Sequence, residues 1–121
     1  MLGILVLSHG SRRKEYNELL KEFAVKLKEK HSYSLVTTAY MEFDTPTLAE
    51  GVRELINRGA GRIIVVPLFL APGNHMVRDI PEEIEKVKSL MGKEIDIQLA
   101  SYIGVDERVV EILHERIQEA I

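Results

Sequence analysis

Apolar segments of strand length alternate with helix-like segments along the whole sequence. Strands are expected over about residues 2–8, 34–41, 62–68 and 95–100, and each is followed by apolar residues at helical spacing. Parallel strands need a crossover between them, and that crossover is usually a helix, so this alternation is typical of βαβ units. The sequence therefore predicts a single α/β domain, residues 1–121, with a four-stranded parallel sheet and helices on both faces.

The hydrophobic runs also predict the order of the strands. The segments "ILVL" and "IIVVPLFL" are apolar on both faces, as in central strands that helices cover on each side. By contrast "LVTTAY" is mixed and "IDIQL" alternates, which favours edge positions. The expected order is 2-1-3-4. In such a sheet the connections leave strands 1 and 3 in opposite directions, and a ligand crevice opens beyond their carboxyl ends.

Each expected helix has one apolar face. Helix boundaries are indicated by capping and turn residues: Thr45 and Gly59 for the second helix, Asp79 with Glu82 for the start of the third, and Asp106 for the start of the fourth. The residues expected to face the sheet are Tyr16, Leu20, Phe23 and Leu27 in the first helix; Leu48, Val52, Leu55 and Ile56 in the second; Ile80, Ile84, Val87 and Met91 in the third; and Val109, Val110, Leu113, Ile117 and Ile121 in the fourth.

Composition excludes several classes of function. The net charge is only -3 and the two signs are interspersed, so no general attraction to nucleic acid or to a membrane surface is expected. There is no cysteine, which excludes disulfides, thiolate metal sites and a cysteine nucleophile. The opening "MLGILVLSHG" lacks a basic leader and is too short to cross a bilayer, so we expect a core strand of a cytoplasmic protein.

Two histidines and a glutamate follow strands at the predicted crevice. His9 follows strand 1, His75 follows strand 3, and Glu42 ends strand 2 on the same rim. Two imidazoles and a carboxylate suit cobalt, nickel, iron or zinc better than magnesium or calcium, which prefer oxygen ligands. A metal-free imidazole would instead accept protons near neutral pH. The alternative for each histidine alone is a hydrogen-bonded loop residue without chemistry.

A positive collar is expected around the mouth of the crevice. The connection "FLAPGNHMVRD" is long for a strand-to-helix loop, and long ordered loops tend to be functional. It carries Arg78, and Ser11, Arg12 and Arg13 follow strand 1. Together these groups would bind carboxylates through charge-assisted hydrogen bonds. The alternative is that the arginines are solvated surface residues.

The sequence resembles the small, half-length class II tetrapyrrole chelatases, among them the sirohydrochlorin cobaltochelatases. The resemblance covers essentially the whole chain. It is carried by three blocks, "LVLSHGSRRKEYNE", "AYMEFDTPTLAEGVRELINRGAGRIIVVPLFLAPGNHMVRDIP" and "ASYIGVDERVVEIL". The middle block is the specific one, because the N-terminal HGS alone would be too short to indicate a family.

The resemblance implies a metal-inserting lyase that places Co²⁺ in sirohydrochlorin on the anaerobic route to cobalamin, without ATP or a prosthetic group. The family's metal-binding histidines match His9 and His75, and its active-site acid matches Glu42. Full-size members contain two such lobes in one chain, so a chain of this length is expected to form a homodimer. Nickel or iron insertion into the same tetrapyrrole remains an alternative.

Two further alternatives belong to other classes. The strand-His-Gly start is similar to that of the histidine phosphatases, but those enzymes have an arginine immediately before the histidine, and here that residue is Ser8. A non-catalytic carrier of a divalent metal or a tetrapyrrole would use the same residue types, and only turnover separates it from an enzyme.

Overall fold

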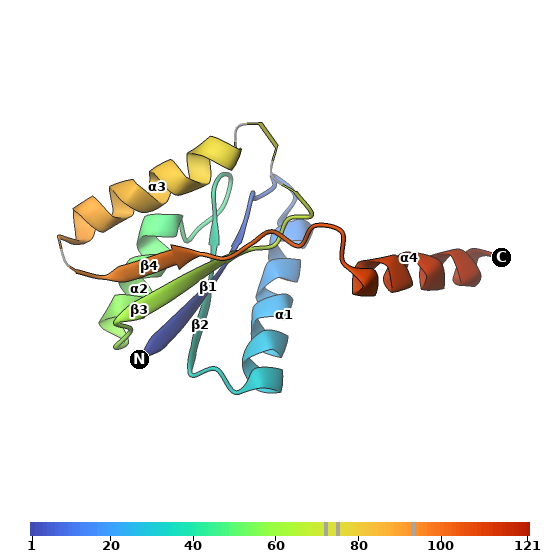
Figure 1. Ribbon diagram of the computed structural model, residues 1–121, viewed down its shortest axis with the longest axis horizontal. Helices are drawn as coiled ribbons and strands as arrows, with labels where there is room; N and C mark the ends of the chain where they lie inside the picture. The colour runs from blue at the N-terminus through green and yellow to red at the C-terminus, as the bar shows by residue number, and fades with distance from the viewer. Residues whose placement is uncertain (72, 75, 93) are drawn as a thin grey trace.

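The computed structural model describes residues 1–71, 73–74, 76–92 and 94–121. Within these residues, strands and helices alternate from the first element to the last (Figure 1). The elements are β1 (Leu2–Ser8), α1 (Lys14–His31), β2 (Leu35–Tyr40), α2 (Leu48–Asn57), β3 (Arg62–Pro67), α3 (Met76–Met91), β4 (Asp96–Leu99) and α4 (Glu107–Ala120).

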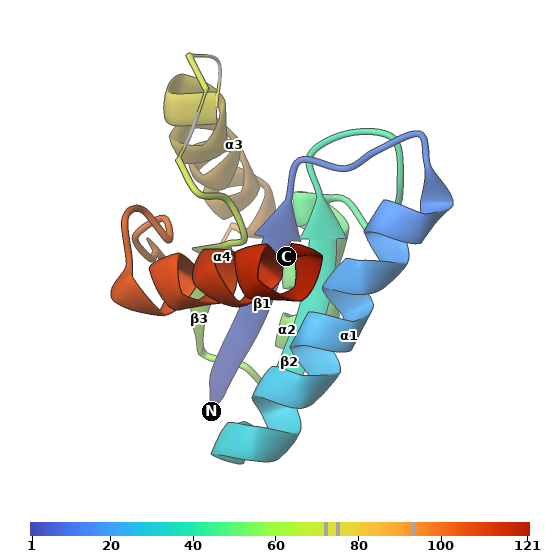
Figure 2. The ribbon, with the colours of Figure 1, turned by 90° about the vertical axis from the view of Figure 1, so that its right-hand side faces the viewer.

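The sheet has the predicted topology. Its order is β2-β1-β3-β4, and every pairing is parallel. In the registers, Ser8 lies opposite Tyr40 and Leu7 lies opposite Pro67, so the carboxyl ends of β1, β2 and β3 lie at one edge. The α/β class, the strand order and the placement of helices on both faces are confirmed, because α2 and α3 cover one face and α1 covers the other (Figures 1 and 2).

The larger part of the core lies between the sheet and the helices α2 and α3. Leu5, Leu7, Ile63, Val65 and Ile97 point to this side and are buried. The predicted inner residues of both helices meet them there: Leu48, Val52, Leu55, Ile80, Ile84 and Val87 are buried, and Ile56 and Met91 are partly buried against the cluster. These two helices therefore follow their sequence patterns closely.

The other face is covered only in part, and here one prediction was wrong. The stripe of α1 that faces the sheet is Asn17, Leu20 and Ala24, with Leu27 partly buried. Tyr16 and Phe23, expected on that stripe, are 57% and 53% exposed. The helix packs over β1 and β2. Tyr16 and Phe23 therefore stay outside the core and line an open hollow with Leu68 and Phe69, which follow β3.

Two helix starts also differ from their predictions. Helix α2 is capped by Thr47, not Thr45, because Glu50 stands three residues after Thr47 and completes a reciprocal capping box. Helix α3 begins at Met76, so Asp79 lies in its first turn and does not cap it. Met76 packs against the core one turn before Ile80, which extends the apolar stripe toward the N-terminus. Gly59 follows the end of α2 as expected, and Asp106 caps α4.

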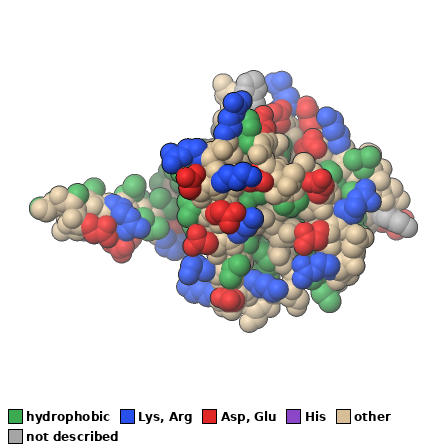
Figure 3. All heavy atoms as spheres, turned by 180° about the vertical axis from the view of Figure 1, so that it is seen from behind, with side chains coloured by type: hydrophobic (Ala, Val, Ile, Leu, Met, Phe, Trp, Pro, Cys, Tyr) green, Lys and Arg blue, Asp and Glu red, His purple; other side chains and the backbone are tan. Residues whose placement is uncertain are grey.

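Helix α4 does not pack on the sheet of its own chain. It extends away from the other elements (Figure 1), and none of its residues, all of which the structure describes, is buried. The expected inner face is therefore wrong for a single chain: Leu113 and Ile117 are 59% and 58% exposed, and apolar side chains are visible along the helix in Figure 3. In the described part of the chain, no helix has the length and apolar character needed to cross a membrane.

Candidate metal-insertion site

The loops that follow β1 and β2 continue the pairing of their strands. Met41 N–H donates to Ser8 O at 3.0 Å, and Glu42 N–H donates to His9 O at 2.9 Å. Gly10 follows with a φ of +94°, and a Cβ atom placed on it would lie 1.8 Å from the carbonyl oxygen of Glu42. Only glycine fits this position, because any side chain would collide with backbone and would also require a strained φ. The "HG" pair thus brings His9 beside Glu42.

His9 and Glu42 meet at their side-chain tips. The Nε2 atom of His9 lies 3.3 Å from Oε2 of Glu42, and the two side chains are 51% and 52% exposed. A neutral imidazole nitrogen either donates its proton or offers a lone pair, and a carboxylate accepts protons or binds cations. The pair can therefore share a proton or bind one cation, and solvent reaches it.

Two hollows meet at His9. One, of about 340 Å³, lies between α1 and the end of β3 and is lined by Ser8, His9, Gly10, Ser11, Tyr16, Asn17, Leu19, Leu20, Phe23, Leu68 and Phe69. The other, of about 320 Å³, is lined by His9, Phe69, Ala71, Gly73, Asn74 and Met76. The exposed aromatic flank of α1 thus lines a wall of the first hollow. Phe69 lines both hollows and stacks on Tyr102 at 6.0 Å between ring centroids.

His75, the second predicted metal ligand, lies outside the described residues. Its sequence neighbours Asn74 and Met76 line the same hollow as His9. Among the described residues, no three histidine, aspartate or glutamate side chains converge as a metal site. Glu42 also lines a small hollow of about 160 Å³ with Asp79, Glu82, Glu83 and Lys86, so the surface beside it is net negative.

Of the predicted collar residues, Ser11 lines the first hollow, and Arg12 and Arg13 follow it with an aromatic partner each. The guanidinium of Arg12 lies over the ring of Phe43 at 5.0 Å, and that of Arg13 lies over Tyr16 at 5.3 Å. Ser11 accepts a hydrogen bond from the Arg13 amide on its Oγ at 3.0 Å. Arg78 is exposed on the first turn of α3. Arg12 therefore lies beside Phe43, the residue after Glu42, and Arg13 lies beside Tyr16, which lines the first hollow.

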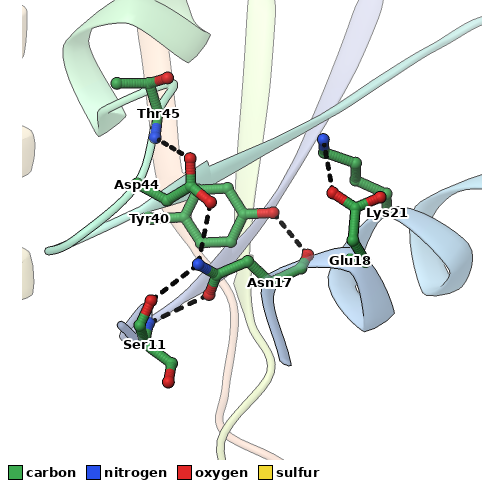
Figure 4. A network of polar contacts seen from close by, with 7 residues as sticks. All are labelled: Ser11, Asn17, Glu18, Lys21, Tyr40, Asp44 and Thr45. Carbon is green, nitrogen blue, oxygen red and sulfur yellow. Dashed lines mark hydrogen bonds and ion pairs between the residues drawn. The ribbon is translucent and has the colours of Figure 1, made fainter. Parts of the chain in front are cut away.

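A buried asparagine links the two loops, and the sequence analysis missed it. Asn17 bonds to Ser11 and to Asp44, and its backbone oxygen accepts from the Tyr40 hydroxyl (Figure 4). The Thr45 amide and, more weakly, the Asn17 amide lower the pKa of Asp44, which keeps that carboxylate ionised as an acceptor. Burial raises the pKa of Tyr40, so its hydroxyl remains a donor.

One signal in the sequence pointed to Asn17. Positions 17, 20, 24 and 27 form a helical stripe whose other members are leucine or alanine. A polar residue in such a stripe is buried beside apolar neighbours and needs hydrogen-bond partners within the protein. The partners themselves, Ser11 and Asp44, were not accessible to sequence reasoning because they come from loops whose paths depend on the fold.

The CbiX family model matches residues 3–120 of this chain. The chain belongs to the CbiX family. Among similar curated proteins, the sirohydrochlorin cobaltochelatase of Sulfurisphaera tokodaii is 39% identical over 121 residues, which cover 100% of this chain and 95% of the relative. That of Saccharolobus solfataricus is 40% identical over 124 residues, covering 98% of this chain and 95% of the relative.

Solved structures share the fold of this CbiX-family chain. The cobalamin biosynthesis CbiX protein from Marinobacter aquaeolei VT8 is 32% identical with a TM-score of 0.83, over 99% of this chain and 97% of that one. The sirohydrochlorin chelatase SirB from Bacillus subtilis subspecies spizizenii, in complex with cobalt, is 33% identical with a TM-score of 0.89. This chain, matched over 98% of its length, spans 50% of that SirB chain.

Replacing Gly10 with alanine tests the loop contact. We expect Gly10→Ala to lower the free energy of unfolding by at least about 2 kcal/mol, because a left-handed backbone and a clash with the Glu42 carbonyl are both unfavourable. Urea denaturation measures this change. The control is Gly61→Ala, where a Cβ meets nothing within 4 Å; it should change stability by less than about 0.5 kcal/mol. Equal effects of the two substitutions would contradict the contact.

Proposed function

We propose that this chain is a sirohydrochlorin cobaltochelatase, a metal-inserting lyase that acts in anaerobic cobalamin synthesis. The observation that carries the proposal is the His9–Glu42 pair, which lies 3.3 Å apart at the junction of two hollows. Relatives about 40% identical over nearly the full length of both chains are sirohydrochlorin cobaltochelatases, which supports the same reaction here. Cobalt is a substrate in this reaction and not a resident cofactor.

The spacing of the pair suits joint binding of one metal ion. Ligands of a first-row divalent ion lie about 2.0–2.2 Å from it, so two neighbouring ligands are roughly 2.8–3.6 Å apart at octahedral or tetrahedral angles. The separation of 3.3 Å between His9 Nε2 and Glu42 Oε2 falls within this range. We propose His9 and His75 as the resting metal ligands, and Glu42 as the acid beside them that can contact the same ion while it is transferred.

Metal insertion then proceeds by exchange of a cation for two protons. Sirohydrochlorin loses two pyrrole N–H protons as Co²⁺ enters, so a base has to accept them at the ring. We infer that Glu42 accepts one of them and that the imidazole released by the departing metal accepts the other. Because the pair is half exposed, the protons pass from these groups to solvent.

The arginine collar holds the acidic substrate. Sirohydrochlorin carries several carboxylates, and guanidinium groups bind carboxylates through paired hydrogen bonds. The guanidinium groups of Arg12 and Arg13 lie over the rings of Phe43 and Tyr16, and such stacking keeps a guanidinium planar face against the ring while its edge can still donate hydrogen bonds. Arg78 and the Ser11 hydroxyl complete the proposed substrate-binding set.

Removing the proposed ligands should abolish turnover without unfolding the chain. We expect His9→Ala and His75→Ala each to lower the rate of cobalt insertion more than about 100-fold, because the cation loses a direct ligand. Initial rates are read from the absorbance of the metallated ring, with the rate in the absence of protein subtracted. His31→Ala, at the exposed end of α1, is the control and should keep the wild-type rate. Unchanged insertion by the His9 and His75 double variant would refute the assignment.

Charge reversal in the collar should affect substrate binding. We expect Arg12→Glu and Arg78→Glu to raise the KM for sirohydrochlorin at least about 10-fold and to lower kcat less, because these groups hold carboxylates away from the reacting nitrogens. Steady-state kinetics over a range of ring concentrations measure both constants. A fall in kcat with unchanged KM would assign the arginines to the chemical step.

Two alternatives are separated by simple measurements. A carrier would yield about one product ring per chain when the protein is limiting, whereas an enzyme yields many. SirB structures with cobalt and with Fe³⁺ share this fold, so iron is a specific competitor for the metal, and nickel is another. Initial rates with Co²⁺, Ni²⁺ and Fe²⁺ at matched free concentrations decide the metal, and we expect cobalt to be inserted fastest.

The active form is proposed to be a homodimer that covers helix α4. The apolar side chains of α4, Val110, Leu113 and Ile117, are exposed in one chain. Val110 and Leu113 also border an apolar hollow of about 290 Å³ with Leu70 and Val105. Such a stripe at helical spacing is typical of a helix that packs on another element. SirB chains of about twice this length contain a second half, and a second copy would supply the equivalent here.

A charge in the apolar stripe should separate the two chains. We expect wild-type protein to have twice the chain mass of 13.8 kDa in light scattering, and Leu113→Glu to shift it to the monomer because burying an unpaired carboxylate is unfavourable. The control is Gln118→Glu, about 140° around the helix from Leu113, which adds the same charge outside the stripe. A monomeric wild type, or equal dissociation by both variants, would overturn the proposed contact.

A further inference from the structure

We propose that Asn17 is a positioning residue that holds His9 and Glu42 at the separation that metal transfer needs. This role rests on the proposed function. Asn17 touches neither the metal nor the ring in the proposed mechanism. Its side chain, on the sheet-facing stripe of α1, is only 3% exposed and reaches both site loops (Figure 4).

The carboxamide of Asn17 joins equivalent points of the two loops. Oδ1 accepts from the Ser11 amide at 3.0 Å, and Nδ2 donates to Ser11 O and to Asp44 Oδ2, each at 2.8 Å. Ser11 stands two residues after His9, and Asp44 stands two residues after Glu42. The bond from Tyr40 OH to Asn17 O, 2.7 Å, fixes the helix itself to β2.

This arrangement requires an amide at position 17. The three bonds need one acceptor oxygen and two N–H donors on the same planar group. Among side chains of this length, only asparagine has them. Aspartate has no donor when ionised and would place a carboxylate against Asp44. Alanine would leave the Ser11 amide, the Ser11 carbonyl and one Asp44 oxygen without these partners.

The hydrogen bonds of Asn17 with Ser11 and Asp44, here called the clamp, complement the backbone contact at Gly10. The bond from Glu42 N–H to His9 O fixes where the two loops begin, and Asn17 fixes them two residues later. With both ends held, neither loop can swing away from the other, and the imidazole and the carboxylate stay adjacent. Small displacements matter here, because a misplacement of about 1 Å at a reacting centre costs up to about 100-fold in rate.

The kinetic test compares Asn17→Ala with Val87→Ala, a substitution that destabilises the core without removing a hydrogen bond of the clamp. We expect Asn17→Ala to lower kcat for cobalt insertion by about 10- to 100-fold with less than about a threefold change in the KM for sirohydrochlorin. Val87→Ala is the control, because Val87 is fully buried in the core beneath α3 and takes no part in the hydrogen bonds between the two loops. Assayed well below both melting temperatures, the control should keep the wild-type kcat. An equal loss in both variants would reduce Asn17 to a merely structural residue and overturn the proposal.

Exchanging the residues at positions 17 and 44 should restore activity, a result that general destabilisation does not predict. Asn17→Asp sets two carboxylates together, so we expect a loss at least as large as that of Asn17→Ala. Adding Asp44→Asn restores the 17–44 hydrogen bond with the donor reversed, and retains the bond from the Ser11 amide. The double variant should recover at least about tenfold in kcat over Asn17→Asp. If the double variant does not recover, the proposed role of the hydrogen bond between positions 17 and 44 is contradicted.

Hydrogen–deuterium exchange separates failure of the clamp from failure of the proposed function. We expect Asn17→Ala, without any ligand, to accelerate exchange in residues 9–13 and 41–45 and not in β3, while Val87→Ala leaves both loops unchanged. If wild-type protein inserts no metal yet this pattern appears, the clamp stands and the cobaltochelatase assignment falls. If insertion occurs and the loops exchange at wild-type rates in Asn17→Ala, the clamp falls alone.

Discussion

The close backbone approach between Gly10 and Glu42 is the constraint on which the site depends. Parallel pairing of β1 with β2 sets Ser8 opposite Tyr40, and two further bonds carry that register into the loops. This continuation is possible only because residue 10 has no Cβ. The imidazole that follows β1 and the carboxylate that follows β2 are adjacent as a result, although 32 residues lie between them in the sequence.

Most of the fold was predictable because a strand that is buried on both faces has a continuous apolar run in the sequence. Continuous apolar runs identified β1 and β3 as central strands, and the mixed patterns of β2 and β4 identified the edges, as the order β2-β1-β3-β4 confirms. The same reasoning predicted that His9 and Glu42 share one rim of the sheet, and the structure places them 3.3 Å apart.

The errors arise where an apolar pattern does not say which surface it contacts. Tyr16 and Phe23 belong to the apolar side of α1, yet they line an open hollow, because the helix packs over only part of the sheet. The stripe of α4 is real, but the sheet of its own chain does not cover it. Asn17 was missed for the converse reason: its partners lie on two loops, and only the folded chain brings Ser11 and Asp44 to it.

The shape of the site and the exposed helix are consistent with one requirement of the proposed substrate. A tetrapyrrole is a broad, flat ligand, and binding sites cover most of a ligand's surface. The two hollows that His9 lines, of about 340 and 320 Å³, are both open to solvent, so under the proposed function a macrocycle lying over His9 would have one face toward the lobe. The other face then needs a second wall. This chain spans 50% of the SirB chain that it matches; under the proposed function, a second copy held through the exposed apolar surface of α4 would supply that wall.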